Sequence, residues 1–173
     1  MVGESNYTEC MVKRKGSTSD SVKKGLMLFL IAAIAIFALI TTGLVQILGF
    51  VLLVVTFVLV ANQWPKFKAE YEYIFVDGQI DFDVVYSGST RKHLKRIDLE
   101  KTEVVAPVGD AALDGYKHLE LKAADYTSRE EGKKVYAIFV KGEKGPEKIL
   151  FEPDENFLQF MKKKSPRKVI LYR

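Results

Sequence analysis

The sequence has few of the residues from which proteins usually build reactive or metal sites. Its 173 residues include one cysteine, Cys10, and two histidines, His93 and His118. A single cysteine excludes an intrachain disulfide and a cysteine-based metal cluster, and it fits a reducing compartment. Neither histidine has the ligand spacing of a metal motif such as HExxH. We therefore expect both histidines to be surface residues of strands, and we expect no catalytic residue, metal or cofactor.

Charge is absent from one long stretch of the chain and nearly balanced elsewhere. No Asp, Glu, Lys or Arg occurs between Gly25 and Trp64, and the whole chain has a net charge of only +4. A nucleic-acid-binding domain normally has a concentrated basic face instead. The apolar stretch is too long, and begins too far along the chain, for a cleavable signal peptide. We therefore expect a protein of the lipid bilayer that does not bind nucleic acid.

The length of the apolar stretch predicts two membrane spans. Residues 25–61 in one helix would measure ~55 Å at about 1.5 Å per residue. The hydrocarbon core of a bilayer is only ~30 Å thick, and typical tilts are about 20°. Two spans, at about 25–42 and 45–62, fit this thickness. The turn is expected at Thr41-Thr42-Gly43, because glycine tolerates a left-handed backbone and hydroxyls can bond to freed backbone groups. A re-entrant hairpin and a buried pair of core helices are the alternatives.

Basic residues on both flanks of the apolar stretch predict its orientation. Lysines and arginines precede the first span and follow the second, whereas the turn carries no charge. The positive-inside rule therefore places both termini in the cytoplasm. Residues 1–24 form a cytoplasmic segment, residues 25–64 the membrane hairpin and residues 65–173 a cytoplasmic domain. Trp64 stands where an interfacial aromatic anchor is expected.

After Pro65 the apolar residues recur at every second position, which predicts β-strands. Two alternating segments flank Asp77-Gly78, and this dipeptide is a strong hairpin signal. A two-residue turn pairs Phe75 with Ile80 and places every apolar cross-strand pair on one face. Further strands are expected over residues 92–98, 102–107, 117–123, 134–141 and 147–152.

Two more elements complete the predicted domain. In "DENFLQFMKKK", Asp154 is placed to cap an amphipathic helix, and the lysines suit the negative end of its dipole. The N-terminal "NYTECMVKRK" also alternates, with Thr8, Cys10 and Val12 on one face. We expect this segment to add a strand to the sheet that follows the membrane, with a disordered tail as the alternative.

About seven antiparallel strands followed by one C-terminal amphipathic helix is the order of a pleckstrin-homology-like (PH-like) barrel or sandwich. The segments "EYEYIFVDGQIDFDVV", "RKHLKRIDL", "EVVAP" and "FEPDENFLQFMKKKSPRKV" resemble an uncharacterised bacterial family with a transmembrane hairpin and a small cytoplasmic PH-like domain. The resemblance covers most of the chain and rests on structural residues. It brings no catalytic site with it, and a shared fold does not decide a function.

One acidic motif has a metal interpretation and a simpler one. Asp81-Phe82-Asp83 resembles a metal-binding DxD. However, strand alternation places both carboxylates on the solvent face because Phe82 faces inward. If Leu94 packs opposite Val84, Lys95 lies opposite Asp83. We therefore expect a cross-strand ion pair here and no metal.

Two basic clusters, "RKHLKR" and "KKKSPRK", are the functional lead. Near an anionic inner leaflet each basic side chain contributes about 1 kcal/mol of attraction. A solvated face balanced by nearby acids is the alternative. The candidate anionic-lipid contacts are Arg91, Lys92, Lys95, Arg96, Lys162, Lys163, Lys164, Arg167 and Lys168.

These features together predict a non-enzymatic module that a membrane hairpin holds at the inner leaflet. There it would bind anionic headgroups or a protein or peptide partner, the latter by strand addition at a sheet edge. The alternative is a structural or accessory subunit that oligomerises through its hairpin, where Ala32, Ala35 and Ala38 permit close helix approach.

Overall fold

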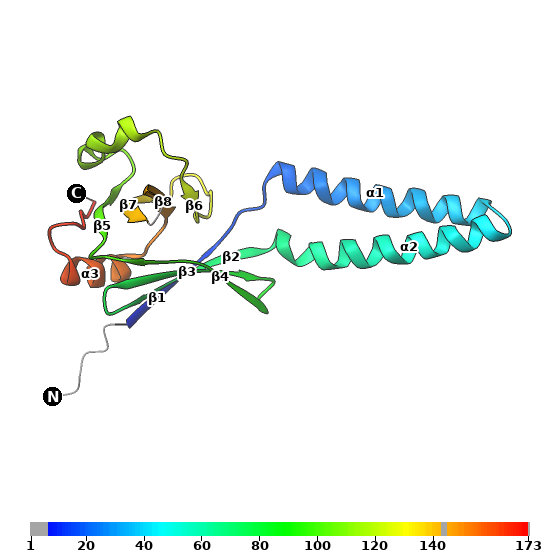
Figure 1. Ribbon diagram of the computed structural model, residues 1–173, viewed down its shortest axis with the longest axis horizontal. Helices are drawn as coiled ribbons and strands as arrows, with labels where there is room; N and C mark the ends of the chain where they lie inside the picture. The colour runs from blue at the N-terminus through cyan, green and yellow to red at the C-terminus, as the bar shows by residue number, and fades with distance from the viewer. Residues whose placement is uncertain (1–6, 143–144, 173) are drawn as a thin grey trace. The chain divides into compact units, whose positions relative to one another are not determined.

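The computed structural model describes residues 7–142 and 145–172. Residues 1–6 of the predicted N-terminal segment, residues 143–144 between two predicted strands, and Arg173 lie outside the described part. The chain divides into two compact units (Figure 1). One unit, residues 15–69, is a helical hairpin. The other combines residues 1–14 with residues 70–173, so segments from both flanks of the hairpin build the β domain.

The hairpin consists of α1 (Thr18–Ile40) and α2 (Leu44–Gln63). The helices are separated at the predicted turn, where Gly43 has a φ of +64°. The hydroxyl of Thr41 donates a 3.0 Å hydrogen bond to the carbonyl of Phe37. Both observations match the physical reason for placing the turn there, since glycine accepts a left-handed backbone and the hydroxyl serves a helix-end carbonyl.

The first helix begins earlier than the apolar stretch does. Ser17 caps it: the Ser17 hydroxyl accepts a hydrogen bond from the backbone N–H of Ser19, and the Asp20 carboxylate accepts one from the N–H of Ser17 at 3.1 Å. This reciprocal cap stabilises a helix start in polar sequence. The helix therefore extends beyond the predicted membrane span, which begins at about residue 25, because its polar first turn is stabilised by the cap and not by hydropathy.

Both helices are long and apolar enough to cross a membrane. Their most apolar windows have mean hydropathies of 2.2 and 2.9, and only 6% and 11% of those windows are buried within the chain. A core helix of a soluble protein would be mostly covered by its own fold. After α2, Pro65 lies in a short 3-10 helix, η1 (Trp64–Phe67).

The first sheet has the order β1-β2-β3-β4. β1 pairs antiparallel with β2, and the register places Cys10 opposite Tyr73 and Lys13 opposite Glu70. Between β2 and β3, Asp77 and Gly78 have φ values of +49° and +93°, as the predicted two-residue hairpin requires. The strands are β1 (Tyr7–Lys13), β2 (Ala69–Val76), β3 (Gln79–Tyr86) and β4 (Thr90–Asp98).

The second sheet has the order β5-β7-β8-β6. The two-residue β6 runs parallel to β8, so the domain is not wholly antiparallel. The C-terminal segment joins the edge of this sheet, because the N–H of Val105 donates to the carbonyl of Lys168 and the N–H of Ile170 donates to the carbonyl of Val105, each at 2.8 Å. The strands are β5 (Thr102–Pro107), β6 (Ala124–Asp125), β7 (Tyr136–Gly142) and β8 (Gly145–Phe151).

The strand predicted over residues 117–123 is wrong. A 3-10 helix, η2 (Ala111–Leu119), occupies this part of the chain, with Asp110 as its cap. Leu113 is buried, and the ring of Tyr116 stacks on Phe139 with centroids 4.7 Å apart. These apolar residues recur at a spacing of three, which suits a 3-10 turn lying on a sheet. His118 is consequently an exposed residue of a 3-10 helix and does not lie on a strand.

Aromatic side chains from both sheets and the last helix form the core. The ring of Tyr73 meets Phe82, Phe151 and Phe157 edge-on, with centroids 5.5 to 6.3 Å apart. Phe157 belongs to α3 (Glu155–Lys164). Asp154 caps this helix as predicted, because its carboxylate accepts a 2.7 Å hydrogen bond from the N–H of Phe157. The helix thus contributes its apolar stripe to the core and leaves its lysines outside.

Candidate functional site

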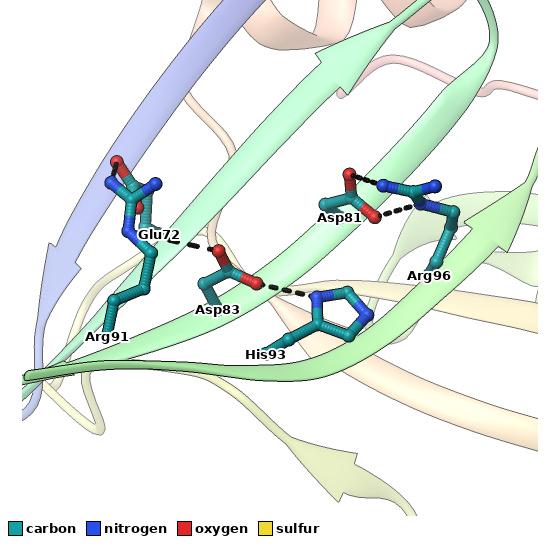
Figure 2. A network of polar contacts seen from close by, with 6 residues as sticks. All are labelled: Glu72, Asp81, Asp83, Arg91, His93 and Arg96. Carbon is teal, nitrogen blue, oxygen red and sulfur yellow. Dashed lines mark hydrogen bonds and ion pairs between the residues drawn. The ribbon is translucent and has the colours of Figure 1, made fainter.

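The outer face of the first sheet carries a network of charged side chains, drawn in Figure 2. These residues alternate with the inward-facing core residues of the same strands. Two of the carboxylates are nevertheless buried, because Glu72 is 4% and Asp83 is 7% exposed. The network comprises Glu72 from β2, Asp81 and Asp83 from β3, and Arg91, His93 and Arg96 from β4.

Arg91 bridges the two buried carboxylates. Its Nη2 donates to Glu72 Oε1 at 2.8 Å and lies 2.6 Å from Glu72 Oε2, and its Nε lies 4.0 Å from Asp83 Oδ2. His93 Nδ1 lies 2.8 Å from Asp83 Oδ1. A buried carboxylate is strongly destabilising unless it is paired and hydrogen-bonded. This part of the network therefore serves the stability of the sheet.

The predicted pairing of Lys95 with Asp83 is wrong. A β-bulge shifts the β3–β4 register, so that Asp83 lies opposite His93 while Phe82 lies opposite Lys95. Leu94 is the extra residue of the bulge. Asp83 is also less exposed than the alternation predicted, because Arg91 and His93 cover it.

Asp81, the other acid of the DxD motif, is held by Arg96. Arg96 Nε and Nη2 donate to the two Asp81 carboxylate oxygens at 2.5 and 2.8 Å, as Figure 2 shows. This bidentate hydrogen bond, together with the negative charge of Asp81, raises the pKa of the Arg96 guanidinium. Such geometry fixes the planar side chain in one orientation.

The basic residues of the C-terminal cluster are used in two ways. Lys162 Nζ donates to the carbonyls of Pro166 and Val169, both at 2.6 Å. Lys168 Nζ donates to the carbonyls of Leu99 and Glu100, at 3.0 and 2.7 Å. These two lysines fasten the C-terminal segment to α3 and to the turn after β4, so much of their hydrogen-bonding capacity is already used within the fold.

The other predicted lipid contacts differ in their exposure and in the interactions that they make within the chain. Lys163 has an interaction within the chain, and Lys164 lays its aliphatic stem beside Gly78. Lys92 and Arg167 are exposed and form no ion pair within the described ranges 7–142 and 145–172. Among the nine candidates, Lys92, Lys164 and Arg167 are thus the most available to an external anion.

A cavity of about 490 Å³ lies where the end of β4 approaches β7 and β8. Lys95 and Arg96, two of the predicted contacts, line it together with Lys101 and Lys141. The acids Asp98 and Glu147 also line it, and Glu147 forms an ion pair with Lys95. Four basic and two acidic side chains therefore surround one concave space, which is called the basic cavity below.

Comparison with known proteins identifies the family of the chain. The family model described as "Bacterial PH-like domain (DUF6106)" matches residues 4–171. The chain belongs to this bacterial PH-like family. No curated protein and no solved structure matches it. The match includes the helical hairpin as well as both sheets, so the predicted resemblance and fold class are confirmed, and the family is one of unknown function.

Within the PH-like domain, the sequence predicted only two of the four basic residues that line the basic cavity. Lys101 and Lys141 are far apart in the chain, but the N–H of Lys141 donates to the carbonyl of Lys101 at 3.2 Å. No local pattern marks either lysine. Only a correct prediction of the β5–β7 pairing would have placed these two lysines side by side. That pairing joins strands that are far apart in the sequence.

Two further polar groups of the PH-like domain are buried for structural reasons. The Tyr73 hydroxyl donates to the carbonyl of Tyr126 at 2.5 Å, and burial raises the pKa of this phenol. The Cys10 thiol points toward the carbonyl of Glu152 at 3.8 Å, and burial raises its pKa as well. A raised pKa keeps a thiol protonated and unreactive, so Cys10 is a packing residue here.

Proposed function

We propose that this chain is an integral membrane protein whose PH-like domain binds its partners at the cytoplasmic surface. The pairing of β1 with β2 carries this proposal. The two strands lie on either side of the hairpin in the sequence, yet they are neighbours in one sheet. Paired strands are about 4.8 Å apart. This pairing supports a location of both flanks on the same side of the membrane, which two crossings satisfy and one crossing does not.

The surface of the hairpin supports its insertion into a bilayer. Large apolar side chains such as Phe29, Leu39 and Phe57 are 61% to 70% exposed. Soluble monomers rarely leave such a continuous apolar surface in water. The basic residues on both flanks of the hairpin favour a cytoplasmic location for the sheets.

The PH-like domain would then act by binding and not by catalysis. Its outer-face carboxylates Glu72, Asp81 and Asp83 are engaged by Arg91, Arg96 and His93, respectively, which argues for a structural use of these acids. Lys92, Lys164 and Arg167 are available to anionic headgroups, each contributing about 1 kcal/mol of attraction near the surface. An anionic headgroup or a protein partner is the ligand class that this arrangement favours.

The alternative of oligomerisation through the hairpin has less support. Ala38, one of three alanines expected to admit a second helix, is fully buried against Gly49 of the same chain. Ala32 remains exposed and Ala35 is partly exposed. A second copy would therefore meet only part of the expected small-residue surface.

Vesicle flotation tests the proposed attraction to the leaflet. In a suitable variant, a short glycine-rich turn joins Lys13 to Glu70 in place of the hairpin, and circular dichroism first verifies its fold. We expect it to float with vesicles containing phosphatidylglycerol at low salt, and to be released at high salt because ions screen such attraction. Vesicles of phosphatidylcholine alone are the control. Absence of binding at both salt concentrations would contradict the proposed lipid attraction.

A further inference from the structure

We propose that the basic cavity is a binding site for a phosphate monoester, with Lys101 and Lys141 as its principal contacts. This inference rests on the proposed function in one respect, since it gives the PH-like domain a specific ligand class. It does not depend on the orientation of the hairpin. The cavity, at about 490 Å³, lies within the range of about 300–1,000 Å³ that is typical of small-molecule sites.

The arrangement of Lys101 and Lys141 is the first argument. Thr102 and Val140 are opposite one another in the β5–β7 pair and both are buried. Lys101 immediately precedes β5, and the N–H of Lys141 donates to its carbonyl at 3.2 Å, so these two exposed lysines are neighbours. Like charges directly opposite on neighbouring strands destabilise a sheet. An anion bound between these two ammonium groups would remove that repulsion.

The availability of these lysines is the second argument. Lys101 is exposed and forms no ion pair with any residue in the described ranges. Lys141 has one ion-pair partner, Glu103, at 3.4 Å, and its side chain is 76% exposed. An exposed pair of this kind contributes little to stability. Both lysines can therefore turn toward a ligand at small energetic cost.

The other basic side chains of the cavity are held in place by acids. Lys95 pairs with Glu147, and Arg96 pairs with Asp81 outside the cavity lining. Asp98, the second acid of the lining, accepts a 2.8 Å hydrogen bond from the N–H of Glu100. The cavity thus combines two cations that are oriented by acids with two exposed lysines.

The charge of the cavity selects the ligand class. Lys95 and Arg96 are each paired with an acid. Lys101 and Lys141 are therefore the two cations of the lining that a ligand can recruit, Lys141 by exchanging its exposed contact with Glu103. A phosphate monoester carries about −1.5 to −2 charges at pH 7 and offers three acceptor oxygens. A phosphodiester carries only one negative charge, so it would match the two lysines less well. The monoester could belong to a soluble sugar phosphate or to a lipid headgroup such as that of phosphatidic acid.

Lysine acylation followed by mass spectrometry tests this site in the full-length chain. In one arm, glycerol 3-phosphate is added to protein in phosphatidylcholine nanodiscs. In the other, the nanodiscs contain phosphatidic acid and no soluble phosphate. We expect protection of Lys101 and Lys141, but not of Lys122, an exposed lysine outside the cavity, in at least one arm, and the protected arm identifies the source of the phosphate. Protection of Lys122 to the same degree would show diffuse attraction, which overturns the site and leaves the proposed leaflet attraction intact.

A matched pair of variants gives an independent readout. Lys101→Gln removes one exposed charge from the cavity, and we expect about fivefold weaker binding of glycerol 3-phosphate by calorimetry. Lys122→Gln removes an exposed charge outside the cavity, and we expect unchanged binding. Wild-type affinity in Lys101→Gln overturns the proposal. Equal protection of Lys101 by polyglutamate also overturns it, because the site would then accept any acidic polymer.

Discussion

Ala38 of α1 and Gly49 of α2 touch across the helical hairpin. A Cβ placed on Gly49 would lie 3.0 Å from the Ala38 Cβ and 3.2 Å from its Cα. Each is also the buried residue of its helix. Small residues let helix backbones approach closely, and such contacts are a main source of helix association in membranes. This contact therefore fixes how α1 and α2 pack.

Enlarging Gly49 should loosen the hairpin. Gly49→Val places two methyl groups against the backbone of Ala38, and overpacking of this kind typically costs about 1–3 kcal/mol. Gly25→Val is the control in α1, because a Cβ at Gly25 meets nothing within 4 Å. Trp64, the only tryptophan, reports on the hairpin by fluorescence during titration with sodium dodecyl sulfate. Equal midpoints for the two variants would contradict the packing role of Gly49.

The PH-like domain should depend on the strand that precedes the hairpin. A chain of residues 65–173 alone lacks β1, which leaves β2 paired with β3 only and uncovers the side of Tyr73 opposite Cys10. We expect this chain to melt at a lower temperature than the variant in which a short turn joins Lys13 to Glu70. Circular dichroism of the two purified proteins makes the comparison. Equal melting temperatures would show that β1 is dispensable.

The Cys10 thiol should resist alkylation while the domain is folded. Its folded-state pKa is raised by burial, so the folded domain holds the thiol proton more tightly than the unfolded chain does. This contribution to stability is present below the unfolded pKa of about 8.5 and is lost as the pH rises above it. We expect Cys10 to react with maleimide at least about tenfold more slowly in the folded domain than in urea.

A neighbour of Cys10 on the same strand provides the control for this experiment. Met11 is 55% exposed, so Met11→Cys in a Cys10→Ala background should react rapidly without denaturant. If Cys10 reacts as fast as this cysteine in the native protein, β1 does not cover the thiol and its described packing is wrong.

Removal of Arg91 should destabilise the first sheet through the acids it pairs with. Arg91→Met leaves the buried Glu72 carboxylate without its cation, and an unsatisfied buried polar group costs about 1–3 kcal/mol. Lys92→Met, at an exposed neighbour, should change the free energy of unfolding by less than about 0.5 kcal/mol. Adding Glu72→Gln to Arg91→Met should restore part of the loss. Urea titrations measure all three effects, and no rescue would contradict the pairing.

Local patterns in the sequence predicted the parts of the fold that local rules control. The Thr41-Thr42-Gly43 turn, the Asp77-Gly78 hairpin, β5 and the cap of α3 at Asp154 all depend on a few adjacent residues. The alternation of Thr8, Cys10 and Val12 likewise indicated the strand that pairs with β2. In each case a backbone preference and the apolar pattern favour the same structure.

The errors have a common physical origin in contacts between distant residues. "KHLELKA" alternates like a strand, but packing of Leu113 and Tyr116 on the second sheet draws its first residues into η2. The bulge at Leu94 depends on how β4 fits β3, and it changed the partner predicted for Lys95. The basic cavity depends on strand pairing that no short segment encodes.

Cysteine labelling from outside intact cells tests the central claim that the hairpin crosses the membrane twice and leaves both flanks in the cytoplasm. Thr42→Cys places a thiol in the turn, and Glu131→Cys places one in an exposed loop of the PH-like domain, each in a Cys10→Ala background. We predict that a membrane-impermeant maleimide labels the turn in intact cells, and labels residue 131 only after the membrane is permeabilised. Labelling of residue 131 in intact cells, or protection of residue 42 until permeabilisation, would contradict the account.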